Sequence, residues 1–158
     1  MKILLIVGLA LLAACAANAS ASASADIITP ISLFNLDGTG LVFGQIVPHS
    51  GGTVTIAPDG TRSSIGVEVV PASASNAAHS QVGGIAGNIF SISLPTGTMI
   101  SSGADSMAVN AFTSDPSGTG TLDVAGIKNL NVGATLHVAA SQPTGHYTGS
   151  FTLTVAYN

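Results

Sequence analysis

The most constraining feature of this sequence is a series of short apolar runs that alternate with polar residues and are separated by glycine and proline. The C-terminus is the clearest example, where Phe151, Leu153, Val155 and Tyr157 alternate with serine, threonine and alanine. Alternation of this kind predicts a β-strand with one buried face. No segment after residue 25 shows the spacing of an amphipathic helix, and we therefore predict an all-β fold.

Further apolar runs predict strands at 41–47, 53–57, 66–70, 88–94, 106–112, 120–124 and 135–139. Pro58, Asp59 and Gly60 predict a hairpin turn after one of them, because glycine readily takes a positive φ. The segment 71–78 is predicted to be a loop, and 82–84 and 118–120 are predicted to be turns. Many short strands at this spacing are typical of a sandwich or barrel, and we predict a sandwich of two antiparallel sheets.

The first residues have the features of a signal peptide. Lys2 precedes a ten-residue apolar run, 3–12, which is too short to span a membrane as a helix. Small residues then recur at the spacing of cleavage sites up to Ala25. We therefore predict a cleaved signal peptide at 1–25 and one domain at 26–158. The expected location is the periplasm, the outer-membrane surface or the extracellular space, and no transmembrane helix is expected.

Cys15 leaves two interpretations of this leader open. Residues 12–15 resemble the lipobox of bacterial lipoproteins, in which the cysteine is lipidated and 18–25 would form a tether. Otherwise Cys15 is removed within an ordinary signal peptide. In both cases the folded part has no cysteine, so its stability depends on its core and not on a disulfide.

Composition excludes several classes of protein. Only 6% of the residues are charged and 46% are hydrophobic, which excludes intrinsic disorder. Beyond residue 25, two strong bases, Arg62 and Lys128, stand against seven carboxylates, a net charge of −5. Nucleic acid is not expected as a partner, because no basic patch can form to neutralise phosphates.

The sequence predicts no enzyme, cofactor or metal site. The histidines show no metal-ligand spacing; they are His49, His79, His137 and His146. His137 is expected on the outward face of its strand. The carboxylates are scattered and lie mostly in predicted turns, where aspartate accepts hydrogen bonds from nearby backbone N–H groups. Glu68 and Asp123 are the exceptions, because both are expected to lie within strands, and Asp123 is expected to face outward.

Several motifs in order resemble a known family. They are 41–47, 52–56 with the turn at 59–60, 88–95, and 145–157. Together they resemble an exported proteobacterial family that is known only as a domain of unknown function. The Gly145, Tyr147 and Gly149 pattern is also similar to spore coat protein U and to archaic chaperone–usher pilins. The resemblance covers 26–158 and implies an immunoglobulin-like, pilin-like antiparallel β-sandwich.

The resemblance also implies a way to assemble. In chaperone–usher pilins one strand is missing, and the N-terminal extension of the next subunit fills the gap by β-strand addition. The donor candidate here is 26–36, with Ile27, Ile31 and Leu33 on one face. The acceptor candidates are the four alternating residues of the C-terminal strand. Pro30 fits poorly in a paired strand, and the same segment could instead be the first strand of its own domain.

Two functions therefore remain open. The first is a non-enzymatic surface structural protein, pilin-like or coat-like, whose partners are copies of itself and a periplasmic chaperone. The alternative is a monomeric binding module for an envelope component or carbohydrate, either periplasmic or held by a lipid anchor at Cys15.

Overall fold

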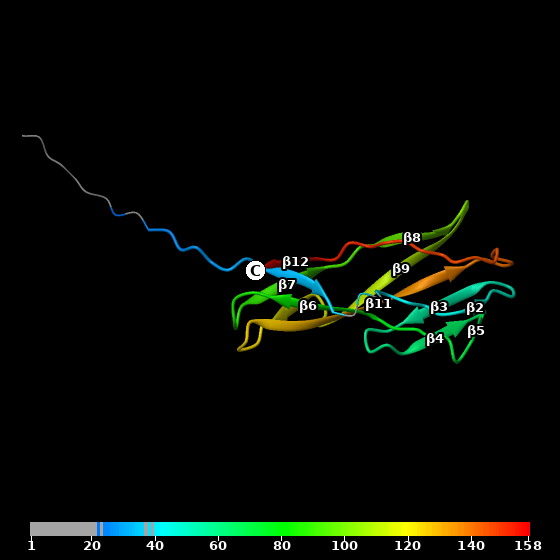
Figure 1. The fold of residues 1–158 in the computed structure, drawn as a ribbon, viewed down its shortest axis with the longest axis horizontal. Coiled ribbons are helices and arrows are strands. Elements are labelled where there is room, and N and C mark those ends of the chain that lie inside the picture. Colours follow the sequence, from blue (N-terminus) through cyan, green and yellow to red (C-terminus); the bar gives the residue numbers. More distant parts are fainter. Residues whose placement is uncertain (1–21, 23, 37, 39) are drawn as a thin grey trace, which may run out of the picture.

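The structure is a computed structural model and describes residues 22, 24–36, 38 and 40–158. Of the predicted signal peptide only Ser22, Ser24 and Ala25 fall within this range, and Cys15 lies outside it. The described residues form β-strands and no helix, which confirms the predicted all-β fold (Figure 1). Over the same range, no helix is long and apolar enough to cross a membrane.

The strands of the described chain are, in order, β1 (Ser32–Asn35), β2 (Ile46–Val47), β3 (Gly52–Ile56), β4 (Arg62–Ile65), β5 (Glu68–Val69), β6 (Ala78–Gly83), β7 (Ile89–Ser93), β8 (Gly97–Ser102), β9 (Asp105–Asp115), β10 (Thr119–Thr121), β11 (Ile127–Val138) and β12 (Thr154–Tyr157).

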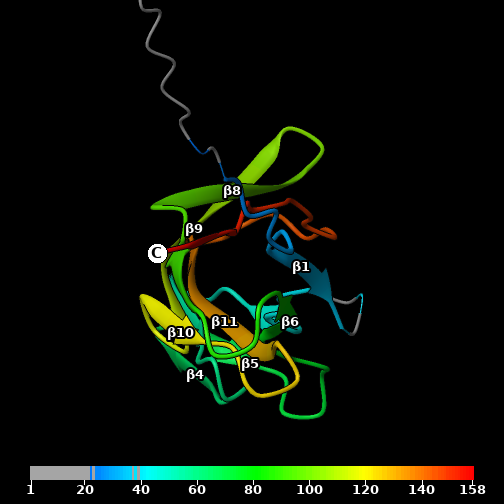
Figure 2. The same cartoon turned by 90° about the vertical axis from the view of Figure 1, so that its left-hand side faces the viewer.

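The large sheet is organised around its longest strand, β11. The first half of β11 pairs with β6, the second half pairs with β3, and β9 pairs along the opposite edge. β1, β4 and β8 extend the sheet next to β6, β3 and β9 respectively. All these pairs are antiparallel, and Figure 2 shows β9 and β11 curving, with β1 facing them.

A smaller sheet with the order β10-β7-β12 completes the sandwich. Fully buried side chains from both sheets meet in the interior, among them Phe90 of β7 and Leu130 and Val132 of β11. A second buried cluster lies further along the molecule, around Ile56 and Leu136. These contacts confirm the predicted two-layer antiparallel sandwich.

The turn between β3 and β4 is the one that the sequence predicted. Gly60 has a φ of 84°, and β3 and β4 pair as an antiparallel hairpin. Asp59 Oδ1 accepts a hydrogen bond from the Thr61 backbone N–H at 2.9 Å. Hydrogen bonding to Thr61 lowers the pKa of the Asp59 carboxyl group. This aspartate therefore has the structural role that was expected of the turn carboxylates.

β6 lies where the sequence predicted the end of a loop at 71–78 and a turn at 82–84, so both predictions were wrong in part. Its inward residues are Ala78, Ser80 and Val82. Two of these are small and one is polar, so they form no obvious apolar stripe. Burial of Ser80 is tolerated because its hydroxyl donates a hydrogen bond to Asn35 Oδ1 at 3.1 Å.

Two predicted strands are interrupted by local backbone geometry. In 41–47 only Ile46–Val47 is a strand, because Gly44 takes a φ of 87° and turns the chain. β10 is Thr119–Thr121, so the predicted strand over 120–124 is confirmed only at its first two residues and was wrong beyond Thr121. Asp123 lies in the following turn and not within a strand, and its Oδ1 accepts hydrogen bonds from two backbone N–H groups.

Candidate functional site

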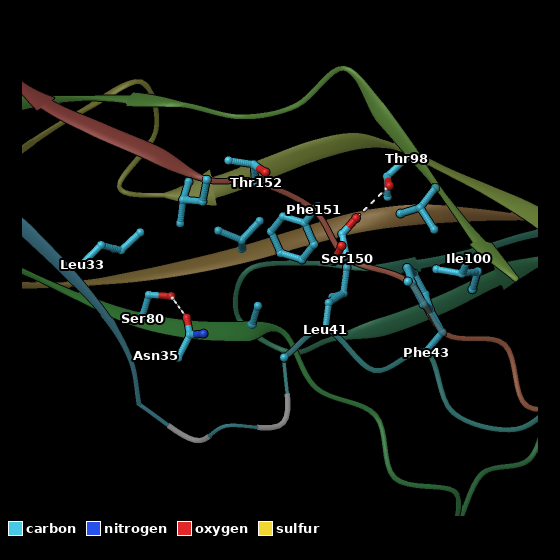
Figure 3. Close-up of a pocket in the computed structure, with 16 residues that line it drawn as sticks. Leu33, Asn35, Leu41, Phe43, Ser80, Thr98, Ile100, Ser150, Phe151 and Thr152 are labelled. Atoms are coloured by element: carbon cyan, nitrogen blue, oxygen red, sulfur yellow. Dashed lines mark hydrogen bonds between the residues drawn. The ribbon is translucent and has the colours of Figure 1, made fainter.

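An open groove runs along the C-terminal part of the chain. It consists of two cavities, of about 530 Å³ and about 850 Å³, which share the lining residues Leu41, Phe43, Ile100 and Gly149. We call this continuous feature the C-terminal groove. Its walls are β1, the segment 40–48 and the C-terminal segment 142–153. Figure 3 shows the smaller cavity, with Leu33 on β1 and Phe151 on the segment that precedes β12.

The C-terminal wall of the groove, 142–153, leads into β12, which is the edge strand of the smaller sheet. β12 pairs with β7 and with no other described strand. Asn158 N–H donates to Ile89 O at 3.2 Å. Because hydrogen-bonded residues alternate along an antiparallel pair, the N–H and C=O groups of Val155 and Tyr157 point toward the other edge. That edge therefore offers backbone groups to an added strand.

The opposite wall is itself a sheet edge. β1 pairs with β6 of its own chain and with no other described strand. Leu36 N–H donates to His79 O at 3.0 Å, so by the same alternation the backbone groups of Leu33 and Asn35 point away from β6. Both residues line the smaller cavity together with 149–153. The cavity therefore lies between the free edge of β1 and the segment that precedes β12.

The third wall, 40–48, is held by one partly buried guanidinium group. Arg62 Nη1 donates to Phe43 O at 3.3 Å and to Ser73 Oγ at 2.9 Å, and Nη2 donates to Val70 O at 2.9 Å. Gly44 is needed here, because a Cβ at this position would lie 2.2 Å from Arg62 Nη1. Arg62 therefore joins two loops that are distant in sequence and keeps Phe43 in the wall of the groove.

The described residues of the groove carry almost no charge. Among those that line either cavity there is no Asp, Glu, Lys or Arg, and His146 and Tyr147 are the titratable ones. Tyr147 Oη donates to Pro143 O at 2.8 Å and accepts from Gln142 Nε2 at 2.9 Å. A largely apolar groove beside a strand edge can bind an extended peptide, because it offers backbone hydrogen bonds and pockets for side chains.

The N-terminal arm, residues 24–30, leaves the body at the end where β12 finishes (Figure 1). Tyr157 Oη donates to Thr29 O at 3.1 Å and accepts from the Ile85 backbone N–H at 2.8 Å. Beyond this point Ile27 is fully exposed and Ile28 is 58% exposed. The arm is therefore attached at its root and presents two large apolar side chains to solvent.

We expect Tyr157→Phe to release the root of the arm. The ring stays, but Thr29 O and Ile85 N–H lose their partner, which should cost about 1–2 kcal/mol of unfolding free energy. Hydrogen exchange followed by mass spectrometry should show faster exchange around residues 27–31. Gly84→Ala should have a similar effect, since its Cβ would lie 2.2 Å from Tyr157 Oη.

Tyr147→Phe is the matched control for this experiment, because the Tyr147 hydroxyl bonds only within its own loop. It should leave exchange at 27–31 unchanged. Equal exchange at 27–31 in the Tyr157 and Tyr147 variants would show that the hydroxyl of Tyr157 does not hold the arm.

The structure brings most of the predicted strand-exchange residues together in one chain. Ile31 and Leu33 pack on the same buried cluster as the C-terminal residues Phe151, Leu153, Val155 and Tyr157. Phe151 also contacts Phe112, with ring centroids 5.0 Å apart. Ile27 takes no part in this packing. The predicted donor segment is therefore divided between β1, which pairs within its own chain, and the exposed arm.

Sequence analysis missed other parts of the groove. Phe43 was recognised only as part of a strand, and Ile100 lies on β8, which was not predicted. The role of Arg62 depends on loops that meet only in the fold. Ile28 lies next to the predicted Ile27 and was also missed. Its apolar character alone could have marked it as part of the donor segment.

The histidines lie outside any metal-binding cluster of the described residues, where no three His, Cys, Asp or Glu side chains are suitably grouped. His137 points outward as predicted, and its Nε2 lies 2.8 Å from Asn110 Oδ1. His79 Nδ1 lies 2.9 Å from Asn131 Oδ1, and His49 Nε2 lies 3.1 Å from Glu68 Oε2. These pairs are explained as polar contacts on the surface of the sheets.

Comparison with known families gives one match. A family model described as a domain of unknown function (DUF4402) matches residues 34–157. A search of curated proteins found no match. The matched region begins within β1 and includes the walls at 40–48 and 142–153, whereas Leu33 and the N-terminal arm precede it.

Proposed function

Because the chain belongs to the family of this domain of unknown function, DUF4402, we propose that it is a non-enzymatic, exported structural subunit that assembles with copies of itself. The assembly step is β-strand addition: the N-terminal arm of one copy fills the C-terminal groove of another. The expected similarity to spore coat protein U and archaic chaperone–usher pilins agrees with this proposal, as does the predicted signal peptide.

The observation that carries the proposal is the open edge of β1 at the groove. β1 and the segment 149–153, which leads into β12, border the same cavity, and the backbone groups of Leu33 and Asn35 point away from β6. A strand placed beside β1 would hydrogen-bond to these backbone groups and cover the half-buried side chains of Leu33 and Phe151. Burial of apolar surface contributes roughly 25 cal/mol for each Å² that is removed from water.

The arm has the properties of the donor. Ile27 and Ile28 are adjacent, so an extended arm directs them to opposite faces, and both are exposed in the single chain. Asp26 is the one charged residue of 24–30. An arm with so little charge suits a groove whose described lining is almost uncharged. Ile31 and Leu33 are already used within their own domain, so the donor consists of the residues before β1. A periplasmic chaperone would occupy the same groove before assembly.

We expect the double variant Ile27→Asp/Ile28→Asp to fold normally and to lose assembly. The isoleucine that faces into the groove contributes about 1.5–3 kcal/mol when it is buried, so association should weaken by at least about 10-fold. The measurement is light scattering after size exclusion on protein from expression of the full chain. Its thermal midpoint should match the original, because neither side chain packs in the core.

Ile65→Asp/Met99→Asp is the matched control, since it places the same two charges at exposed apolar positions away from the arm. A synthetic peptide of residues 22–31 should also bind to the double arm variant, whose groove is empty. Unchanged assembly of the arm variant, or no binding of the peptide, would contradict the proposal. A monomeric original protein with a lipid mass on Cys15 would favour the anchored binding module.

A further inference from the structure

The outer face of the large sheet carries a regular group of uncharged side chains where β1, β6 and β11 lie side by side. We call it the amide face. Its six residues are Phe34 and Leu36 at β1, His79 and Gln81 on β6, and Asn129 and Asn131 on β11. The residues between them, among them Leu33, Ser80 and Leu130, point to the interior. The amide face is therefore on the opposite side of the sheet from the C-terminal groove.

The amide face consists of two rows that cross the strands. In the first row Phe34 is paired with Gln81, and Gln81 is paired with Asn129. The second row lies two residues further along each strand, about 7 Å away, and repeats the order with leucine, histidine and asparagine. Phe34 is 57% exposed and Leu36 is 52% exposed. Each row therefore has one large apolar side chain at β1 and a pair of polar side chains next to it.

The polar pair of each row is hydrogen-bonded, which fixes the groups that remain. Gln81 Nε2 donates to Asn129 Oδ1 at 3.2 Å, so Gln81 Oε1 is left as an acceptor and Asn129 Nδ2 as a donor. In the second row His79 Nδ1 lies 2.9 Å from Asn131 Oδ1. Because a carboxamide oxygen only accepts, Nδ1 donates, which leaves His79 Nε2 of the neutral ring as an acceptor and Asn131 Nδ2 as a donor. In the part of the chain that the structure describes, each row thus keeps one acceptor beside one donor without a partner.

This combination matches the chemistry of an uncharged sugar chain. Sugar hydroxyl groups both donate and accept hydrogen bonds, and the C–H face of a sugar ring packs on aromatic and aliphatic side chains. No Lys or Arg is among the six residues, and Asp115 of β9 borders the face beside Asn131, so an acidic ligand would be repelled. Four of the six side chains are polar, whereas the core of a protein–protein interface is mostly apolar. The face therefore favours a neutral sugar over a second copy of the chain.

We propose that the amide face binds a neutral, extended polysaccharide that lies along the strand direction. Successive sugar rings pack on Phe34 and Leu36, and their hydroxyl groups bond to the free donor and acceptor of each row. The side chains are already oriented by their mutual hydrogen bonds, and their strands are held by the buried core, so little ordering is needed on binding. This site goes beyond the proposed assembly and does not depend on strand addition.

Native gel electrophoresis through dissolved polysaccharide tests the proposal on protein obtained from the full chain. The neutral probes are hydroxyethylcellulose, galactomannan and dextran, and the acidic probe is polygalacturonate. At least one neutral probe should slow the migration of the protein, and polygalacturonate should not. The proposal is overturned if no neutral probe slows the protein, or if polygalacturonate slows it equally.

Two variants assign the binding to the amide face. Phe34→Ala and Asn129→Ala should each weaken binding about 5-fold or more, because each removes one contact to the sugar chain. Ile65→Ala and Asn88→Ala are the matched controls at exposed positions away from this face, and both should bind as the original does. Thermal midpoints show that all four variants are folded. Equal binding by the variants and their controls would overturn the proposal.

Nuclear magnetic resonance on the original sequence gives a readout that needs no variant. An oligosaccharide of the neutral probe that binds should shift the side-chain amide signals of Gln81, Asn129 and Asn131. Shifts confined to Gln45 and Gln142 would place the sugar in the C-terminal groove and overturn the proposal.

Two further results separate this site from assembly. The arm variant Ile27→Asp/Ile28→Asp should bind the polysaccharide as the original does, even though it has lost assembly. If Phe34→Ala instead lowered assembly in light scattering and left polysaccharide binding unchanged, the amide face would be an interface between copies and the proposal would be wrong.

Discussion

Phe90→Ala should destabilise the fold more than any other truncation of a single aromatic side chain in this chain. Phe90 is 0% exposed in the central strand of the smaller sheet, and it packs on Gly120, where a Cβ would lie 2.5 Å from its ring. Truncation of a buried phenylalanine costs about 3–5 kcal/mol. Since small domains have about 5–15 kcal/mol of stability in total, this loss is large. Unfolding in urea should show it directly as a lower midpoint.

Phe34→Ala is the control for this measurement. Phe34 lies on β1 and is 57% exposed, so its truncation should cost less than about 1 kcal/mol. If both variants unfolded at the same urea concentration, the cluster around Phe90 would not be the main core of the domain.

The second large effect is expected at Arg62. Arg62→Ala leaves Phe43 O, Val70 O and Ser73 Oγ without their charged donor. Hydrogen bonds from charged groups contribute about 1.5–3 kcal/mol each and do not add fully, so we expect a loss of about 2–4 kcal/mol. Arg62→Lys should recover only part of this loss, because a single ammonium group cannot reproduce the fork of a guanidinium. Urea unfolding measures both variants.

A local readout separates this effect from a general loss of stability. The wall at 40–48 should become more sensitive to limited proteolysis, and the 22–31 peptide should bind less tightly because Phe43 is no longer held in place. Lys128→Ala removes the other cation of the domain from an exposed position on β11 and should change the unfolding free energy by less than about 0.5 kcal/mol. Equal unfolding free energies and equal proteolysis of Arg62→Ala and Lys128→Ala would show that Arg62 does not hold the wall at 40–48.

The parts of the fold that the sequence predicted are those governed by local chemistry. The turn at Asp59 and Gly60 is set by a side-chain hydrogen bond and a positive φ, both of which are properties of the residues themselves. The all-β class follows from alternation, which is also local. The inward face of Phe151, Leu153, Val155 and Tyr157 was predicted for the same reason.

The parts that were not predicted depend on contacts between distant residues. β11 begins eight residues before the predicted strand at 135–139, because its first half is defined by pairing with β6. The exposed residues of this half include Lys128 and Asn129. The groove itself was not predicted. The alternation of the C-terminal residues was recognised, although only Thr154–Tyr157 forms a strand there. Arg62 and Ser73 come together from distant segments, and no local pattern connects them.

The central position of β11 also determines when the chain can fold. Thr55 of β3 and Thr135 of β11, whose hydroxyl oxygens lie 2.9 Å apart, are separated by 80 residues. During synthesis the N-terminal part of the chain appears first, so β3 and β4 can pair only as an isolated hairpin until β11 appears. Two-stranded hairpins are marginally stable in water. Long-range pairing of this kind slows folding to about milliseconds to seconds. The emergence of residues 127–138 is therefore the event that allows cooperative folding, and until then the strand edges of β3, β6 and β9 are exposed to aggregation and proteolysis.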